Sequence, residues 1–161
     1  MQLSKNFTLA ELTRSSTAAK RGIANTPNAA QIENLRILAT RCLQPARDAY
    51  GKPITVNNGF RSQAVNVALK KEGWHPSDTS QHMTGEAADI RCAADKANNK
   101  ELFDIIWKSG NYDQLIWEDG DDKFPDWVHV SFKLSGNRQQ ILRMRSGRTT
   151  HRKYNGTNWA I

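Results

Sequence analysis

The chain is organised around residues 80–89, S-Q-H-M-T-G-E-A-A-D. The stretch carries an imidazole, His82, and a carboxylate, Asp89, with Gly85 between them. Glycine lets the backbone turn sharply, and the small residues after Gly85 are typical of a buried central strand. Imidazole and carboxylate groups are both zinc ligands in proteins. The stretch therefore predicts a loop and a strand that give two ligands to one metal ion.

A third ligand is predicted at His129, in P-D-W-V-H-V-S-F over residues 125–132. The valines and aromatic residues around it alternate as in a strand, which places Asp126 near the start of that strand. A catalytic zinc takes three protein ligands and keeps a fourth position for water. The sequence therefore predicts a zinc site made of His82, Asp89 and His129.

Three sequence blocks together resemble one known family. They are G-F-R-S at 59–62, S-x-H-x-x-G-x-A-x-D at 80–89 and D-x-x-H at 126–129, and the middle block is the most specific. The family is that of the zinc D-alanyl-D-alanine carboxypeptidases and L-alanyl-D-glutamate endopeptidases, which cut peptidoglycan stem peptides. The resemblance covers roughly residues 7–134. It implies the fold shared with the Hedgehog signalling domain, a zinc cofactor and peptidoglycan stem peptides as substrate.

The same resemblance implies roles for single residues. Zinc would lower the pKa of a bound water to about 7. Asp126 would act as general base and then as general acid, while Arg61 would help to stabilise the oxyanion at the attacked carbonyl. Substrate contacts are expected from Ser80, Glu118 and Trp127. For Glu118, a structural acid at the end of a strand remains a competing interpretation.

Composition places the chain among soluble globular proteins. It has 161 residues, of which 38% are hydrophobic and 24% charged, and this length suits one domain with a single core. No apolar run approaches the roughly 20 residues of a membrane span. Cys42 and Cys92 are expected to be buried thiols. Because the start lacks an apolar signal region, we expect synthesis in the cytoplasm and action on the cell wall, as for phage lysis or tail enzymes.

The positive charge is concentrated at the C-terminal end. Residues 1–132 hold 16 of the 23 Lys and Arg and all 16 Asp and Glu. We expect a peptidase domain over 1–146 and a basic arm over 147–161, with His151 at the surface and Trp159 and Ile161 docking its end. Such an arm is attracted to polyanions, here anionic envelope polymers, although a solvated tail explains it equally well. The cations after residue 132 are Lys133, Arg138, Arg143, Arg145, Arg148, Arg152 and Lys153.

Periodicity predicts an α+β fold with one domain, in which helices pack on a small, mainly antiparallel sheet. A capping-box spacing opens the first helix, and Gly51 and Gly110 are predicted helix ends. His75 is expected on an exposed loop. The expected elements are a short helix after residue 7, helices over 28–49, 62–71 and 95–109, a strand over 54–58, a strand carrying Asp89, and a hairpin of 113–118 with 126–132.

Three functions compete. The first is a monomeric zinc peptidase of the cell wall, which accounts for the ligands, the base and the arginine together. The second is a non-catalytic zinc module that binds the wall. Such a module would have no use for a base at Asp126 or for the arginine at position 61. The third is a nucleic-acid-binding protein acting through its basic end, which leaves residues 80–89 unexplained. We expect the first, without specific nucleic-acid binding and without a membrane span.

Overall fold

The computed structural model describes residues 1–150 and 152–160, so the expectations for His151 and Ile161 lie outside the described residues. No helix within these ranges has the length and apolar character needed to cross a bilayer. The helices are α1 Leu9–Thr13, α2 Ser16–Arg21, α3 Ala29–Leu38, the π-helical Ala39–Leu43, α4 Gln44–Tyr50, α5 Gln63–Lys71, the 3₁₀ turn Lys96–Asn98 and α6 Asn99–Ser109. The strands are β1 Ile54–Asn58, β2 Ala87–Cys92, β3 Gln114–Glu118, β4 Trp127–Ser131, β5 Gln140–Arg145, β6 Arg148–Thr150, β7 Lys153–Tyr154 and β8 Trp159–Ala160.

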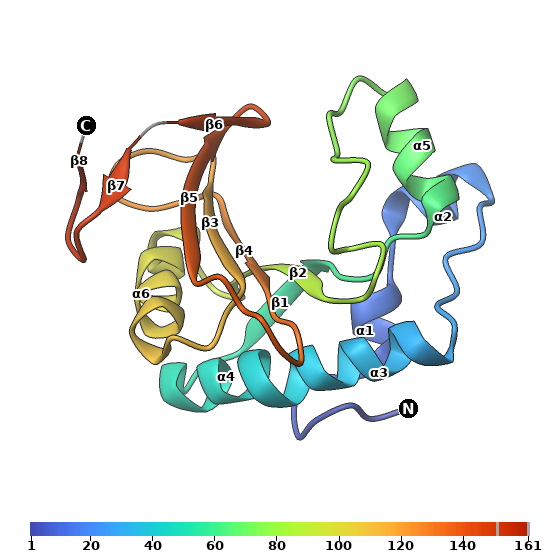
Figure 1. Ribbon diagram of the computed structural model, residues 1–161, viewed down its shortest axis with the longest axis horizontal. Coiled ribbons are helices and arrows are strands. Elements are labelled where there is room, and N and C mark those ends of the chain that lie inside the picture. Colours follow the sequence, from blue (N-terminus) through green and yellow to red (C-terminus); the bar gives the residue numbers. More distant parts are fainter. Residues whose placement is uncertain (151, 161) are drawn as a thin grey trace.

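Six strands form one sheet in the order β1-β2-β4-β3-β5-β6, and β7 pairs with β8 in a separate hairpin. All neighbours in the large sheet are antiparallel except β3 and β5. Figure 1 shows α6 and the β7–β8 hairpin on one side of this sheet, and α5 with the loop that follows it on the other. The predicted α+β class and the predicted β3–β4 hairpin are confirmed.

The two faces of the sheet have different roles, because side chains alternate along each strand. One face packs into the core and carries Val56, Ile90, Val128 and Trp117, which are register neighbours across β1, β2, β4 and β3. The opposite face carries the neighbours of these residues along the chain. There Asp89 pairs with His129, so that both predicted ligands face the same side.

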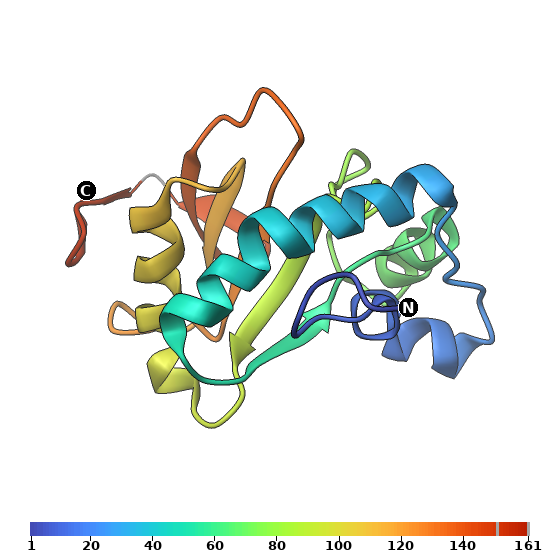
Figure 2. The ribbon, with the colours of Figure 1, turned by 90° about the horizontal axis from the view of Figure 1, so that it is seen from below.

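A long helical segment, α3 to α4, runs diagonally across the sheet in Figure 2 and supplies buried leucines to the core. Its predicted start is confirmed by a capping box at Asn28, and its predicted end by Gly51 in the left-handed conformation. The sequence pattern does not predict the π-helical segment Ala39–Leu43 in the middle of this helix. Pro45 has no N–H to donate to Arg41, and the N–H of Gln44 instead reaches back five residues to Ala39.

The C-terminal segment is part of the core rather than a loose arm. Trp159 is buried against Phe103 of α6 and Trp117 of β3, with ring centroids 6.2 and 5.8 Å away. Tyr154 completes this aromatic cluster. The boundary expected at residue 147 therefore does not coincide with a break in packing, since β5, β6 and the β7–β8 hairpin continue one structure.

Arg143 shows why the sequence gives a misleading view of the basic end. Its side chain is fully buried, with the guanidinium carbon 5.8 Å from the Trp117 ring and 5.7 Å from the Trp159 ring. Nη1 lies 2.6 Å from the carboxylate of Asp122. Other late cations are paired as well, Arg152 with Asp122 and Arg138 with Asp113. Two acids from the neutral part of the chain, Asp113 and Asp122, thus pair with several of the C-terminal cations.

Candidate metal centre and active site

The three predicted ligands come together. His82 Nε2 lies 3.2 Å from His129 Nδ1 and 3.4 Å from Asp89 Oδ1, and the last two atoms are 3.0 Å apart. All three side chains are buried or nearly so. Asp89 and His129 are held by the β2–β4 ladder, while His82 comes from the loop between α5 and β2.

The His82 ring is oriented by the protein backbone. Its Nδ1 donates to the carbonyl oxygen of Gly59 at 2.7 Å, and because a carbonyl only accepts, Nδ1 carries the proton. Nε2 is then left with a free lone pair that faces the other two ligands. Such a hydrogen bond on the far side of the ring is typical of a histidine that binds metal.

The loop that carries His82 depends on Gly85, as the sequence predicts. Gly85 has φ of +78°, and a Cβ there would lie 2.6 Å from the carbonyl oxygen of Gln31. The side chains of Gln31 and Asn34, on α3, donate to the carbonyls of Met83 and Thr84. The turn is thereby packed directly on the helix, with no space for a side chain.

Asp89 is a buried carboxylate that is held ionised. Burial alone would raise its pKa, but the nearby imidazoles of His82 and His129 outweigh burial and keep the pKa well below its usual range. Oδ1 faces both histidines, and Oδ2 accepts from Asn58 Nδ2 at 3.3 Å. A buried negative charge next to two ring nitrogens is the environment that a divalent cation neutralises.

The donor set fits zinc in number, type and spacing. With zinc–ligand distances of about 2.0–2.1 Å, a tetrahedral site separates its ligand atoms by about 3.3 Å. The three distances between the ligand atoms here, 3.0, 3.2 and 3.4 Å, match that separation. Within residues 1–150 and 152–160, His82, Asp89 and His129 are the one group of three or more His, Cys, Asp or Glu side chains whose ligand atoms lie close enough to share one ion.

Arg61 also lies at the site. Its Nη2 donates to Ser80 Oγ at 3.0 Å, and its backbone N–H donates to the carbonyl of His82. Burial lowers the pKa of Arg61, and the charge of Asp89 opposes that effect. Ser62, the next residue, caps α5 as predicted. The predicted residues Arg61 and Ser80 therefore form one unit beside the metal ligands.

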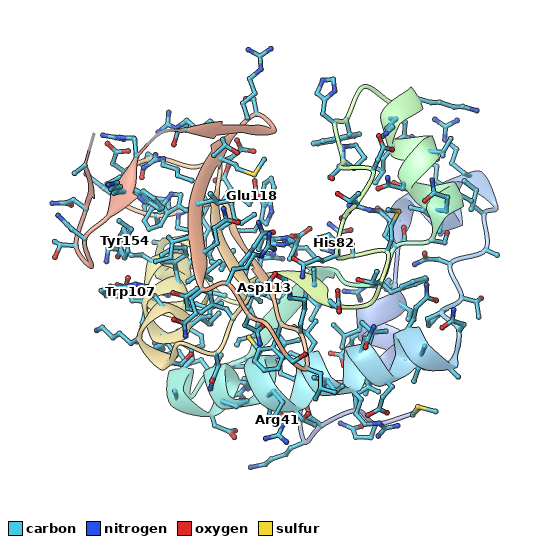
Figure 3. All side chains as sticks on the ribbon, in the orientation of Figure 1. Arg41, His82, Trp107, Asp113, Glu118 and Tyr154 are labelled. Atoms are coloured by element: carbon cyan, nitrogen blue, oxygen red, sulfur yellow. The ribbon has the colours of Figure 1, made fainter. Side chains whose placement is uncertain are left out.

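Glu118 and Trp127 share the face of the sheet that carries His129. In the β3–β4 register, Ile116 pairs with His129 and Glu118 pairs with Trp127, and paired residues in antiparallel strands point the same way. Figure 3 shows Glu118 at the upper end of the sheet and His82 on the loop that faces it. Burial raises the pKa of Glu118 to about 7, with His129 lowering it and Asp89 raising it further.

Asp126, the predicted base, is not brought to the metal cluster. It lies just before β4, and its carboxylate is not in the group formed by His82, Asp89 and His129. Its carboxylate accepts from Lys96 Nζ at 2.8 Å, and its backbone carbonyl accepts from Asn99 at the start of α6. The sequence spacing D-x-x-H is present, and in this structure the aspartate forms a partly exposed ion pair with Lys96.

Two supporting residues were not identified from the sequence. Gly59 orients the His82 ring, and Asn58 holds the second oxygen of Asp89. Both lie at the end of β1, and Asn58 is the register partner of Asp89. The sequence feature that could have indicated this role is the pair of asparagines, Asn57 and Asn58, at the end of a strand that is otherwise half-buried. The histidine expected on an exposed loop, His75, is exposed.

The fold and the site together define a single-domain α+β protein with a His-Asp-His centre suited to zinc. A family model described as Peptidase M15 matches residues 5–131. The chain therefore belongs to the peptidase M15 family, whose members are zinc-dependent. No curated protein matches the chain.

Proposed function

We propose that this chain is a zinc peptidase that hydrolyses peptide bonds in the stem peptides of bacterial peptidoglycan. One observation carries the proposal: the His82, Asp89 and His129 cluster has the spacing of a zinc site, and a half-buried carboxylate, Glu118, stands on the same face of the sheet. Membership of the peptidase M15 family supports the same class of reaction.

Zinc held by His82, Asp89 and His129 would supply a Lewis acid that polarises the scissile carbonyl and makes a water molecule more acidic. Hydrolysis also needs a base that takes a proton from water and an acid that gives one to the leaving amine. We assign both roles to Glu118. In the metal-free protein burial raises the pKa of Glu118 to about 7, and a carboxyl that can take up and release a proton near neutrality is matched to this exchange.

This assignment replaces the role first expected for Asp126. The Asp126 carboxylate is 38% exposed and is paired with Lys96. Glu118 shares the face of the sheet that carries His129, and burial raises its pKa.

Arg61 is proposed to stabilise the negative charge that develops on the carbonyl oxygen of the substrate. Its Nε is buried and has no hydrogen-bond acceptor in the described chain, so the guanidinium retains a donor for a further partner. Ser80 fixes the other end of the guanidinium. A preorganised cation of this kind typically contributes more to the transition state than to substrate binding.

Substrate contacts are proposed for Ser80 and Trp127. Trp127 is half-buried and lies across from Glu118, where an aromatic ring can cover an apolar part of a stem peptide. The exposed cations Arg148 and Lys153 belong to the strands β6 and β7. We propose that they favour approach of the monomeric protein to the anionic envelope, as a long-range attraction rather than a specific contact.

Digestion of purified muropeptides by zinc-loaded protein tests the proposal. Mass spectrometry of the products identifies the cleaved bond. Loss of a terminal alanine indicates a carboxypeptidase, and separation of L-alanine from the rest of the stem indicates an endopeptidase. Intact stem peptides after incubation with protein that holds one zinc per chain would contradict the proposed activity and would favour a binding module.

A further inference from the structure

A second group of buried polar side chains lies outside the metal cluster, around Asp113. This carboxylate directly precedes β3 and is fully buried (Figure 3). Its Oδ1 accepts from the backbone N–H and Nε of Arg138, at 2.9 and 3.0 Å. Its Oδ2 accepts from Nη2 of Arg138 and from Gln81 Nε2, the latter at 3.0 Å. Lys133 Nζ lies 3.4 Å from the same carboxylate.

The partners of Asp113 keep it ionised. Burial alone would raise the pKa of Asp113, but the hydrogen bonds from Arg138 and Gln81 outweigh burial and hold the pKa below its usual range. An ionised carboxylate removed from water is costly unless its partners remain in place. Arg138 and Gln81 are therefore held to Asp113 and, through it, to the sheet.

Gln81 connects this group to the metal site, because the next residue is His82. Both ends of the Gln81 amide are engaged: Nε2 donates to Asp113, and Oε1 accepts from Arg138 Nη2 at 3.4 Å. The backbone carbonyl of Gln81 accepts from the N–H of Glu86 at 3.0 Å and from the hydroxyl of Thr84. The turn that carries His82 is thus hydrogen-bonded to the backbone of Gln81, and the side chain of Gln81 is hydrogen-bonded to Asp113, next to β3.

The metal ligands differ in how they are positioned. Asp89 and His129 are fixed relative to each other by the β2–β4 ladder. His82 stands on a loop, and its distance from His129 depends on how that loop docks on the sheet. Arg138 lies beyond residues 5–131, the segment matched by the family, so part of this docking comes from the C-terminal segment of this chain.

We propose that Gln81, Asp113 and Arg138 act as a positioning group that sets the location of His82, so that metal affinity depends on Arg138 although it touches no ligand. The inference rests on the proposed zinc site and extends it to residues after position 131. These three are positioning residues, since they act through the His82 loop.

The test compares zinc affinity among Gln81→Ala, Arg138→Ala, the double variant and the parent, by competition with a chromophoric chelator. Each single variant should bind zinc about 10-fold more weakly, as expected when support for a metal ligand is lost. The double variant should be close to the weaker single variant, because both changes break one link. Arg138→Lys, which keeps the charge but loses the planar fork, should fall between parent and Arg138→Ala. Arg148→Ala is the control, an exposed arginine on β6, and should leave affinity unchanged.

Urea unfolding of the metal-free variants separates affinity from stability, and the visible spectrum of the Co²⁺-substituted protein reports ligand geometry directly. A Gln81→Ala protein that is folded and binds zinc within twofold of the parent would overturn the positioning role. If Arg138→Ala does not fold, Gln81→Ala decides alone, since it removes only the link to the loop. A parent that binds no zinc would instead overturn the proposed function itself.

Discussion

Asp89 and His129 are direct partners across β2 and β4, and their ligand atoms lie 3.0 Å apart. The sheet thus fixes two of the three ligands, while the loop at His82 supplies the third at nearly the same distance. A site whose geometry is set in advance loses little conformational freedom when it binds an ion.

The first prediction concerns the metal. His82→Ala, Asp89→Ala and His129→Ala should each reduce zinc from about one ion per chain to near zero, as measured by elemental analysis. In the parent, free zinc at 100 times its dissociation constant should add about 2.7 kcal/mol to the free energy of unfolding. The exposed His75 serves as control, and His75→Ala should keep both the metal and this stabilisation. Equal zinc content in all four variants would exclude the cluster as the site.

The second prediction concerns Gly85, which has a counterpart in Gly73. Both have positive φ, +78° and +86°, but a Cβ at Gly85 would lie 2.6 Å from a carbonyl oxygen, whereas nothing lies within 4 Å of one at Gly73. Gly73→Ala should cost about 1 kcal/mol through backbone strain alone. Gly85→Ala should cost clearly more and should also weaken zinc binding, because the His82 loop must move. Equal unfolding midpoints and equal zinc affinity would show that the turn is not held against α3.

The ligand trio and most elements could be predicted from sequence, because residue type and local spacing carry that information. The orientation of the two candidate bases could not be predicted. Glu118 and Asp126 stand at the two ends of one turn, and only the pairing register and strand alternation show which of them faces His129. Docking of Trp159 was expected from the sequence, but its partners could not be predicted, because they come from α6 and β3, far away in the chain.

The third prediction concerns that C-terminal packing. Trp159→Ala should lower the free energy of unfolding by about 3–5 kcal/mol, since it removes a large buried ring from the aromatic cluster. Thr157→Ala, an exposed change in the same hairpin, should stay within about 0.5 kcal/mol of the parent. Urea denaturation measures both. A Trp159→Ala protein as stable as the Thr157→Ala control would mean that the hairpin is a separate arm after all.

The fourth prediction concerns pH and the metal-free protein. In the folded protein, burial raises the pKa of Glu118 from its ordinary value of 4.5 to about 7. Ionised Glu118 therefore destabilises the fold: the cost is absent below about pH 4, grows as the pH rises and is complete above pH 7. In the presence of a chelator, Glu118→Gln should be more stable than the parent at pH 8, by no more than about 3 kcal/mol, and equal to it at pH 4. The same difference at both pH values would mean that burial does not perturb this carboxyl.

The most direct test of the central claim compares Glu118→Gln with Asp126→Asn, two substitutions that remove a carboxylate and keep its shape. Both proteins should retain about one zinc per chain, because neither residue belongs to the ligand cluster. Muropeptide hydrolysis should fall about 10²- to 10⁴-fold in Glu118→Gln, the usual contribution of a general base, and should change little in Asp126→Asn. A zinc-loaded Glu118→Gln enzyme with full activity, beside an inactive Asp126→Asn enzyme, would contradict the account.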